Sequence, residues 1–274
     1  MKHKHAVVIA GDTRTWAYSI GTVAPFLKEA DIYVSVWTES RYSHHVSREK
    51  YSHPQVTENV VRSILEPFVP TSICIEDHNH SHWARSGYNS NYLHRLRTGV
   101  NMVKHSGVEY DSVMLMRPDL IFGPGDNEYL QDLLRFGRSP VKGQLVTVMS
   151  QSLLNDWLLA VHPDDMDKVI PTVEQYSPHK HEDWHTFHKN FVAGNGMSIL
   201  DIEHVPVLIL RPPVHDHVTY EDAYRNTRLW NGKYVVNVIN TQGIEAALRA
   251  WGPPAVKHAI EDLIDSDTWR IPPV

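Results

Sequence analysis

Short apolar runs alternate with amphipathic segments along most of the chain. Apolar or β-branched runs occupy residues 6–10, 31–37, 72–75, 112–116, 145–149 and 205–210. Runs of this length are typical of strands buried in a parallel sheet. Apolar residues at helical spacing predict helices within 15–29, 56–65, 91–106, 163–176 and 183–192. We read 41–51 and 76–90 as loops. The alternation predicts one α/β domain with a twisted, mostly parallel central sheet.

Composition narrows the classes of protein to consider. The chain has 274 residues, a hydrophobic fraction of 42% and a formal net charge of -6, so it has enough apolar material for a core and is not disordered. Its single cysteine excludes a disulfide framework and fits a reducing compartment. No apolar run approaches the ~20 residues of a spanning helix. We therefore expect a cytoplasmic protein with no membrane span.

One strand runs directly into charged residues. The apolar run 112–116 is followed by Arg117, Pro118 and Asp119, and then by a second apolar run at 120–122. Such a strand delivers its carboxylate to the carboxyl edge of the sheet, where open α/β sheets bind ligands. A carboxylate there suits Mg²⁺ or Mn²⁺ bound together with phosphate oxygens. An Arg117–Asp119 ion pair that merely ends the strand explains the pattern equally well.

Four stretches, in order along the chain, carry a family resemblance. They are AGDTR at 10–14, ADIYVSVWT at 30–38, YDSVMLMRPD at 110–119 and NDW at 155–157. Together they resemble the GT-A type nucleotide-sugar glycosyltransferases of bacteria and viruses. The resemblance implies one GT-A-like, Rossmann-related domain over 1–274. Its parts would be a nucleotide-sugar-binding half (1–122), an acceptor and catalytic half (123–240) and a C-terminal helical tail (241–274).

The resemblance also implies roles for individual residues. A nucleotide-sugar donor would be bound by Gly11, Asp12, Arg14, Trp37, Arg97, Arg117 and Asp119. A divalent cation, Mn²⁺ or Mg²⁺, would be held by Asp119, His215 and His217. This chain has Arg-Pro-Asp where the family has Asp-x-Asp, which leaves one carboxylate instead of two. Candidates for the catalytic base are Asp156, Glu182 and Asp183, and the sequence does not choose among them.

Two acceptors fit the resemblance, a glycan and a viral hydroxymethylated DNA base. A DNA acceptor requires a basic, aromatic groove and a flipped base. The acceptor-binding residues predicted on either reading are Trp83, Arg85, Tyr92 and Arg95. Arg97 and Lys104 extend this basic set. The negative net charge opposes nucleic-acid binding, so we favour the glycan. The sequence leaves the oligomeric state open.

A different class of enzyme competes with this reading. His181-Glu182-Asp183-Trp184-His185 matches the H-E-x-x-H pattern, in which two histidines on one helix face bind zinc and the glutamate acts as base. With 19 histidines in the chain, the match arises easily by chance. A zinc metallohydrolase is therefore the alternative. A non-catalytic nucleotide-sugar-binding domain is a third reading, which needs the sheet but no base.

Overall fold

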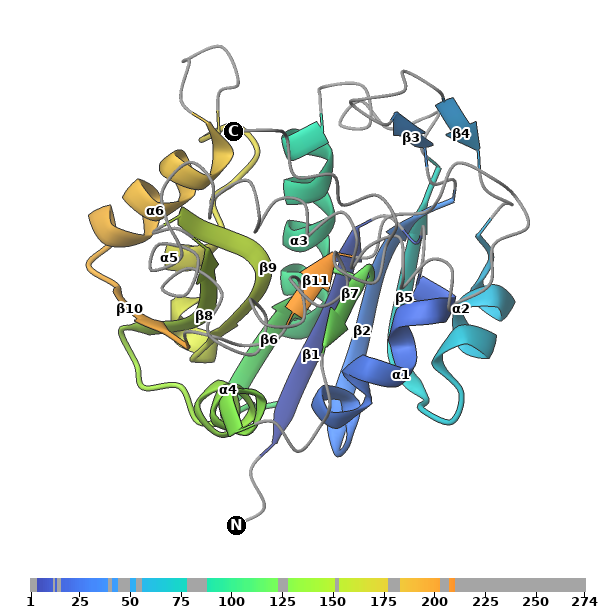
Figure 1. The fold of residues 1–274 in the computed structure, drawn as a ribbon, viewed down its shortest axis with the longest axis horizontal. Helices are drawn as coiled ribbons and strands as arrows, with labels where there is room; N and C mark the ends of the chain where they lie inside the picture. The colour runs from blue at the N-terminus through green and yellow to red at the C-terminus, as the bar shows by residue number, and fades with distance from the viewer. Residues whose placement is uncertain are drawn as a thin grey trace, which may run out of the picture.

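Seven strands form a central sheet in the order β10-β8-β9-β6-β1-β2-β5 (Figure 1). The computed structural model describes residues 4–11, 13, 16–38, 41–43, 50–52, 56–77, 88–122, 128–150, 153–176, 183–202 and 207–209. The sheet strands are β1 (His5–Gly11), β2 (Ala30–Trp37), β5 (Pro70–Glu76), β6 (Ser112–Met116), β8 (Gln144–Ser150), β9 (Leu153–Val161) and β10 (Ser198–Asp201). Only β9 runs antiparallel to its neighbours in this sheet. The predicted α/β class with a mostly parallel sheet is confirmed.

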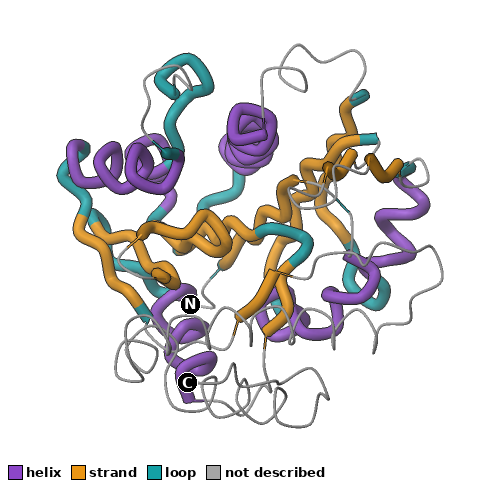
Figure 2. The backbone as a smooth tube through the Cα atoms, turned by 45° about the horizontal axis from the view of Figure 1, so that its top comes forward, coloured by secondary structure: helices purple, strands orange, loops and turns teal. Residues whose placement is uncertain are grey.

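Helices cover both faces of the sheet (Figure 2). One face packs against α1 (Trp16–Leu27), α2 (Glu58–Leu65) and α4 (Glu128–Arg138), and the other against α3 (Tyr88–His105), α5 (Met166–Val169) and α6 (Trp184–Gly194). The central strand β1 alternates between the two cores. Val7 and Ile9 enter the first, and Ala6, Val8 and Ala10 enter the second. Burial on both faces explains why this strand reads as a continuous apolar run.

Two short antiparallel pairs lie outside the main sheet. β7 (Leu120–Phe122) pairs with β11 (Val207–Ile209), and β3 (Arg41–Ser43) pairs with β4 (Lys50–Ser52). The β7 strand follows directly on the Arg-Pro-Asp triplet, so its pairing holds the chain in place just beyond the end of β6. None of the helices in the described ranges is long and apolar enough to cross a membrane.

The amino edge of the sheet is closed by a polar chain that joins two of the family-like stretches. The Tyr110 hydroxyl donates to the Asp31 carboxylate at 2.7 Å, and the Tyr33 and Tyr110 hydroxyls are 2.8 Å apart. Burial and these hydrogen bonds raise the pKa of Tyr110 above its ordinary value. This chain connects the start of β2 to the segment that enters β6. Asp31 and Tyr110 therefore serve the sheet at the edge opposite the predicted site.

The structure corrects several elements. The helix predicted over 163–176 is wrong, because a 3-10 turn, η2 (Pro163–Asp165), and α5 end at Val169. The reason is Pro171, which excludes the helical conformation from the preceding residue; Ile170 has φ -104° and ψ 104°. The stretch 41–51 contains β3 and part of β4 and is not a continuous loop. The strand β10 and helix α4 were not predicted.

A glycine lets α3 pack closely on the central strand, which gives a test of the packing. A Cβ on Gly99 would lie 2.2 Å from Cγ1 of Val8. We expect Gly99→Ala to lower the free energy of unfolding by about 1–3 kcal/mol, because the helix must move away from β1. Gly21 in α1 has no neighbour within 4 Å of such a Cβ. As the matched control, Gly21→Ala should raise stability by roughly 0.5–1 kcal/mol. Urea unfolding measures both; equal effects of the two changes would contradict this account of the packing.

Candidate functional site

Strand register brings the ends of five strands together at one edge of the sheet, toward the top of Figure 1. Gly11 at the end of β1 is opposite Val36, and Trp37 at the end of β2 is opposite Glu76. On the other side, Ile9 is opposite Met116, two residues before Pro118. The antiparallel strand β9 begins at this same edge, where β8 ends. This is the edge at which open α/β sheets bind ligands.

At Gly11, two other segments of the chain approach the backbone of β1 closely. Its φ of +126° is a conformation that side-chain-bearing residues rarely adopt. A Cβ there would lie 3.4 Å from the Tyr92 ring and 3.6 Å from Cδ of Pro118. The end of β1, the start of α3 and the Arg-Pro-Asp triplet therefore meet around one glycine. The structure brings together Gly11, Tyr92, Arg117 and Asp119, which the sequence assigned to donor and acceptor binding.

Arg117 and Asp119 form a buried, two-pronged ion pair. Nε of Arg117 donates to Oδ1 of Asp119, and a terminal nitrogen donates to Oδ2, both at 2.8 Å. Asp119 is 1% exposed, and the guanidinium carbon lies 5.6 Å from the centre of the Tyr92 ring. The Arg117 backbone N–H donates to the Trp157 carbonyl at 3.1 Å. The triplet is thereby tied to both α3 and β9.

The Arg117–Asp119 pair determines whether the Asp119 carboxylate is available to bind the predicted cation. Both oxygens of Asp119 accept hydrogen bonds from a guanidinium, so the carboxylate charge is already balanced. His215 and His217 lie outside the described residues. Among the residues that are described, no group of three histidines, cysteines or carboxylates is arranged to hold a metal ion. The described donor set does not fit Mn²⁺ or Mg²⁺ by itself, and we derive no step through a cation.

Next along the edge, Arg95 joins the ends of β2 and β5. It is fully buried, and it donates to Oγ of Ser35 at 3.0 Å and to Glu76 at 3.1 Å. Its guanidinium carbon lies 4.8 Å from the centre of the Trp37 ring. Trp37 is itself buried and stacks on His94 with ring centres 5.8 Å apart. Arg95 and Trp37, predicted as acceptor-binding and donor-binding residues, therefore lie beneath the surface as supports of this edge.

Glu76 and His94 are residues that sequence reasoning missed. Nε2 of His94 is 2.8 Å from Oε2 of Glu76. That hydrogen bond, aided by the Arg95 charge and opposed by burial, lowers the pKa of Glu76 below its ordinary value. The signal was available, because a carboxylate ending an apolar strand is the pattern that singled out Asp119. The apolar run 72–75 stops one residue short of the observed end of β5 at Glu76.

The basic residues of α3 are committed to other contacts. Arg97 donates to Asp167 at 2.9 Å and to the Ile170 carbonyl at 2.7 Å. Lys104 contacts the same aspartate at 2.5 Å. These bonds fasten α3 to α5 and engage the guanidinium of Arg97, a predicted donor-binding residue, in that contact. With Arg95 buried as well, the described part of the chain presents no basic groove along α3 for DNA.

The catalytic candidates separate into different environments. Asp183 caps α6: Oδ1 accepts from the backbone N–H groups of His185 and Thr186 at 2.9 and 3.1 Å, and Oδ2 accepts from the Thr186 hydroxyl at 2.5 Å. These bonds, led by the Thr186 hydroxyl, lower the pKa of Asp183 and make it a weaker base. The backbone of Asp156 lies in β9, near the start of that strand at the candidate edge. Its side chain and all of Glu182 lie outside the described residues.

The start of α6 also concerns the alternative prediction of a zinc metallohydrolase. α6 begins at Trp184 with Asp183 as its cap, and His181 and Glu182 lie outside the described residues. His188, one turn on, is buried, with Nε2 2.8 Å from the Val169 carbonyl. Of the H-E-x-x-H pattern, the described helix contains Trp184 and His185. The other predicted site residues outside the described ranges are Asp12, Arg14, Trp83, Arg85, His215 and His217.

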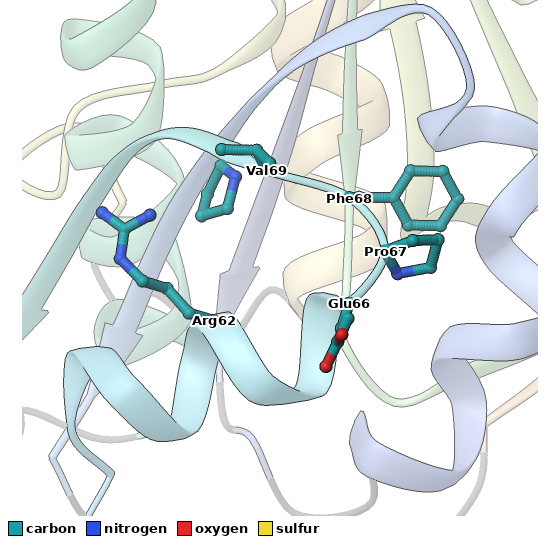
Figure 3. Close-up of a pocket in the computed structure, with 6 residues that line it drawn as sticks. Arg62, Glu66, Pro67, Phe68 and Val69 are labelled. Carbon is teal, nitrogen blue, oxygen red and sulfur yellow. The ribbon is translucent and has the colours of Figure 1, made fainter.

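A shallow pocket of about 380 Å³ lies far from these groups (Figure 3). It surrounds the turn between α2 and β5 and is lined by Arg62, Glu66, Pro67, Phe68, Val69 and Pro70. Because β5 starts at Pro70, the pocket belongs to the amino edge of the sheet. Val69 is 77% exposed, and Arg62 is paired with Glu58 on its own helix. No set of polar groups converges there, so we place the candidate site at the carboxyl edge.

Comparisons with known proteins give distant likenesses in structure only. No model of a protein family matches the chain, and no curated protein does. The apo form of the glycosyltransferase GlyE of Streptococcus pneumoniae TIGR4 aligns with 16% identity and a TM-score of 0.43, over 73% of this chain and 46% of that one. The chain thus spans about half the length of GlyE.

Two further solved structures align over more of their own length. The galactosyltransferase LgtC, in complex with donor and acceptor sugar analogues, aligns with 14% identity and a TM-score of 0.43, over 71% of this chain and 72% of that one. The inositol-1-phosphate CTP transferase of T. maritima has 10% identity and a TM-score of 0.40, over 81% and 95%. Likeness at this level carries no functional argument, so function is argued from the residues.

The buried ion pair predicts an asymmetry between single and double substitutions. Arg117→Met leaves the Asp119 carboxylate buried without its partner, and we expect a loss of about 3–5 kcal/mol in the free energy of unfolding. Adding Asp119→Leu removes that uncompensated charge, so the double variant should be more stable than the single one. The exposed pair of Arg62 and Glu58 supplies the control, since Arg62→Met should change stability by less than about 0.5 kcal/mol. Urea unfolding measures all three; a double variant no more stable than Arg117→Met would rule the pair out as the cause.

The cap of α6 predicts a pH-dependent difference between two variants. Asp183→Ala should cost about 0.5–2 kcal/mol at pH 7, whereas Asp183→Asn keeps an acceptor oxygen and should cost less. The folded pKa of Asp183 is lowered, so the charge contributes stability above its unfolded pKa of about 3.9. That contribution is lost as the pH falls through the lower folded value. Thermal unfolding should show a larger advantage of wild type over Asp183→Asn at pH 7 than at pH 3; a constant difference would contradict the assignment.

Proposed function

We propose that the protein is a glycosyltransferase that moves a sugar from a nucleoside-diphosphate-sugar to the hydroxyl of a glycan. One observation carries the proposal: Gly11, with its positive φ, packs against Tyr92 and Pro118 beside the buried Arg117–Asp119 pair. This convergence lies at the carboxyl edge of a mostly parallel sheet, the position at which such sheets bind nucleotides. The four family-like stretches support the same reading, because two of them contribute directly to this convergence.

The chemistry assigns different tasks to different parts of this edge. The absence of a side chain at Gly11 lets the first loop approach the nucleotide, and Arg14 is our candidate to balance the charge of the leaving diphosphate. The Arg117–Asp119 pair holds the loop after β6 rigid between α3 and β9. Arg95, Glu76 and Trp37 do the same for the ends of β2 and β5. A rigid edge of this kind orients a donor without reorganising during the reaction.

We propose a glycan in preference to DNA as the acceptor. A DNA acceptor must be gripped through its phosphates by free basic side chains. Arg95 is buried, and Arg97 and Lys104 are both engaged by Asp167. The net charge of -6 adds to this argument. Glycan binding through hydroxyls and stacking makes no such demand on the helix.

Nucleotide binding is the direct test of the donor. UDP, GDP and CDP are each added at 100 times their dissociation constant, and the one that binds should raise the free energy of unfolding by about 2.7 kcal/mol. Arg14→Ala should remove most of this gain. Arg62→Ala, on α2 at the opposite edge, is the matched control and should keep it. Each titration is run by calorimetry with EDTA and with Mn²⁺. If no nucleoside diphosphate stabilises the protein in either condition, the proposed donor is wrong.

A further inference from the structure

His185 has a fixed tautomer. It lies in the first turn of α6 and is partly exposed. Its Nδ1 is 2.9 Å from the backbone carbonyl oxygen of Leu154. A carbonyl oxygen only accepts, so Nδ1 must carry the hydrogen. In the neutral imidazole, Nε2 then bears the lone pair and is a hydrogen-bond acceptor. In the described part of the chain, Nε2 makes no hydrogen bond.

This imidazole belongs to the candidate edge. Leu154 lies at the start of β9, the strand that begins where β6 and β8 end. Three residues further along β9, the Trp157 carbonyl accepts the backbone N–H of Arg117. At about 3.3 Å per residue, the two anchor points are at most about 10 Å apart. His185 and Arg117 are therefore both fastened to the first part of β9.

The other histidine of α6 is placed differently. His188 points its Nε2 at the Val169 carbonyl, is buried and stacks on Trp184 with ring centres 4.9 Å apart. It therefore serves the core between α5 and α6. His185 is held from the opposite side by the cap, because its backbone N–H donates to Asp183. One histidine of the helix is internal, and the other is held at the sheet edge with an acceptor nitrogen.

We propose that His185 binds the acceptor substrate, with Nε2 accepting a hydrogen bond from the hydroxyl that receives the sugar. This inference rests on the proposed glycosyltransferase function and deepens it on the acceptor side. The Leu154 carbonyl sets the tautomer, and the Asp183 cap sets the backbone from which the ring extends. The molecule bound at Nε2 must carry a hydroxyl group. It is the acceptor sugar or, when no sugar is present, water.

The test uses a substitution that removes the acceptor nitrogen Nε2 but keeps a donor for the Leu154 carbonyl. His185→Asn keeps a side-chain N–H that can donate to the Leu154 carbonyl but has no group at Nε2. UDP-glucose, UDP-galactose and GDP-mannose are first screened for binding by calorimetry. Release of nucleoside diphosphate is then measured with water alone and with lactose, galactose or N-acetylglucosamine. We expect His185→Asn to bind the donor within twofold of wild type and to lose about 10- to 100-fold in kcat/KM for the acceptor, since a hydrogen bond to the acceptor hydroxyl is removed.

Two further variants keep the test decisive. His105→Asn is the matched control, because Nδ1 of His105 is also bonded to a carbonyl, that of Asn101 at 2.7 Å, but on the exposed last turn of α3. It should behave as wild type. If His185→Asn does not fold, His185→Ala is assayed with and without added imidazole, which should restore turnover.

Each of the other possible results contradicts either the proposed function or the role proposed for His185. If the wild type binds none of the three nucleotide sugars, the proposed function and this inference both fail. If it binds a donor, and His185→Asn releases nucleoside diphosphate as fast as wild type or neither protein releases any, the inference fails while the donor proposal stands. Stoichiometric zinc in the wild type that is lost in His185→Asn would assign the imidazole to a metal and overturn the inference.

Discussion

The parallel pairing of β1 with both of its neighbours is the constraint on which the rest of this structure depends. β1 is buried on both faces, and its register places the residues that follow it beside the ends of β2 and β6. The helix α3 packs closely on Val8 at Gly99. Tyr92 and Arg95 reach the edge for this reason, since the helix lies directly across β1 and β2. A slip of one residue in β1 would exchange its two core faces.

The two buried guanidiniums at this edge are tolerated because each is paired with a carboxylate. Arg117 is paired with Asp119, and Arg95 with Glu76, and both guanidiniums also lie near an aromatic ring. A buried pair adds little net stability over apolar residues of the same volume, but removing one partner is costly. Such pairs therefore hold one geometry in place. Two such pairs, one after β6 and the other joining α3 to the end of β5, indicate an edge that is held in place at two points.

Much of the fold was predictable, because its signals are local. The apolar runs placed β1, β2, β6 and β8 within a few residues, and helical spacing found α1, α2, α3 and α6. The Arg-Pro-Asp triplet was located at the correct edge, since a strand that ends in charge must end at a sheet edge. The helix over 163–176 failed because Pro171 outweighs a favourable start, and the antiparallel β9 gave no clear periodicity. Partners of Arg95 and Arg97 were not predictable, because each lies at least 19 residues away in the chain.

By itself, the sequence determined the class of fold, the edge that carries the charged residues and the candidates for its chemistry. Hydrophobic periodicity and strand ends are properties of neighbouring residues, so they are readable without a structure. Only the tertiary structure decided which candidates are buried and which are bonded to distant segments. The tertiary structure buries Arg95 and Trp37, joins Arg97 to α5 and places Asp183 as the cap of α6. It also gave His185 its tautomer through Leu154, 31 residues earlier in the chain. Burial and hydrogen-bond partners depend on which distant segments meet, and local patterns do not contain that information.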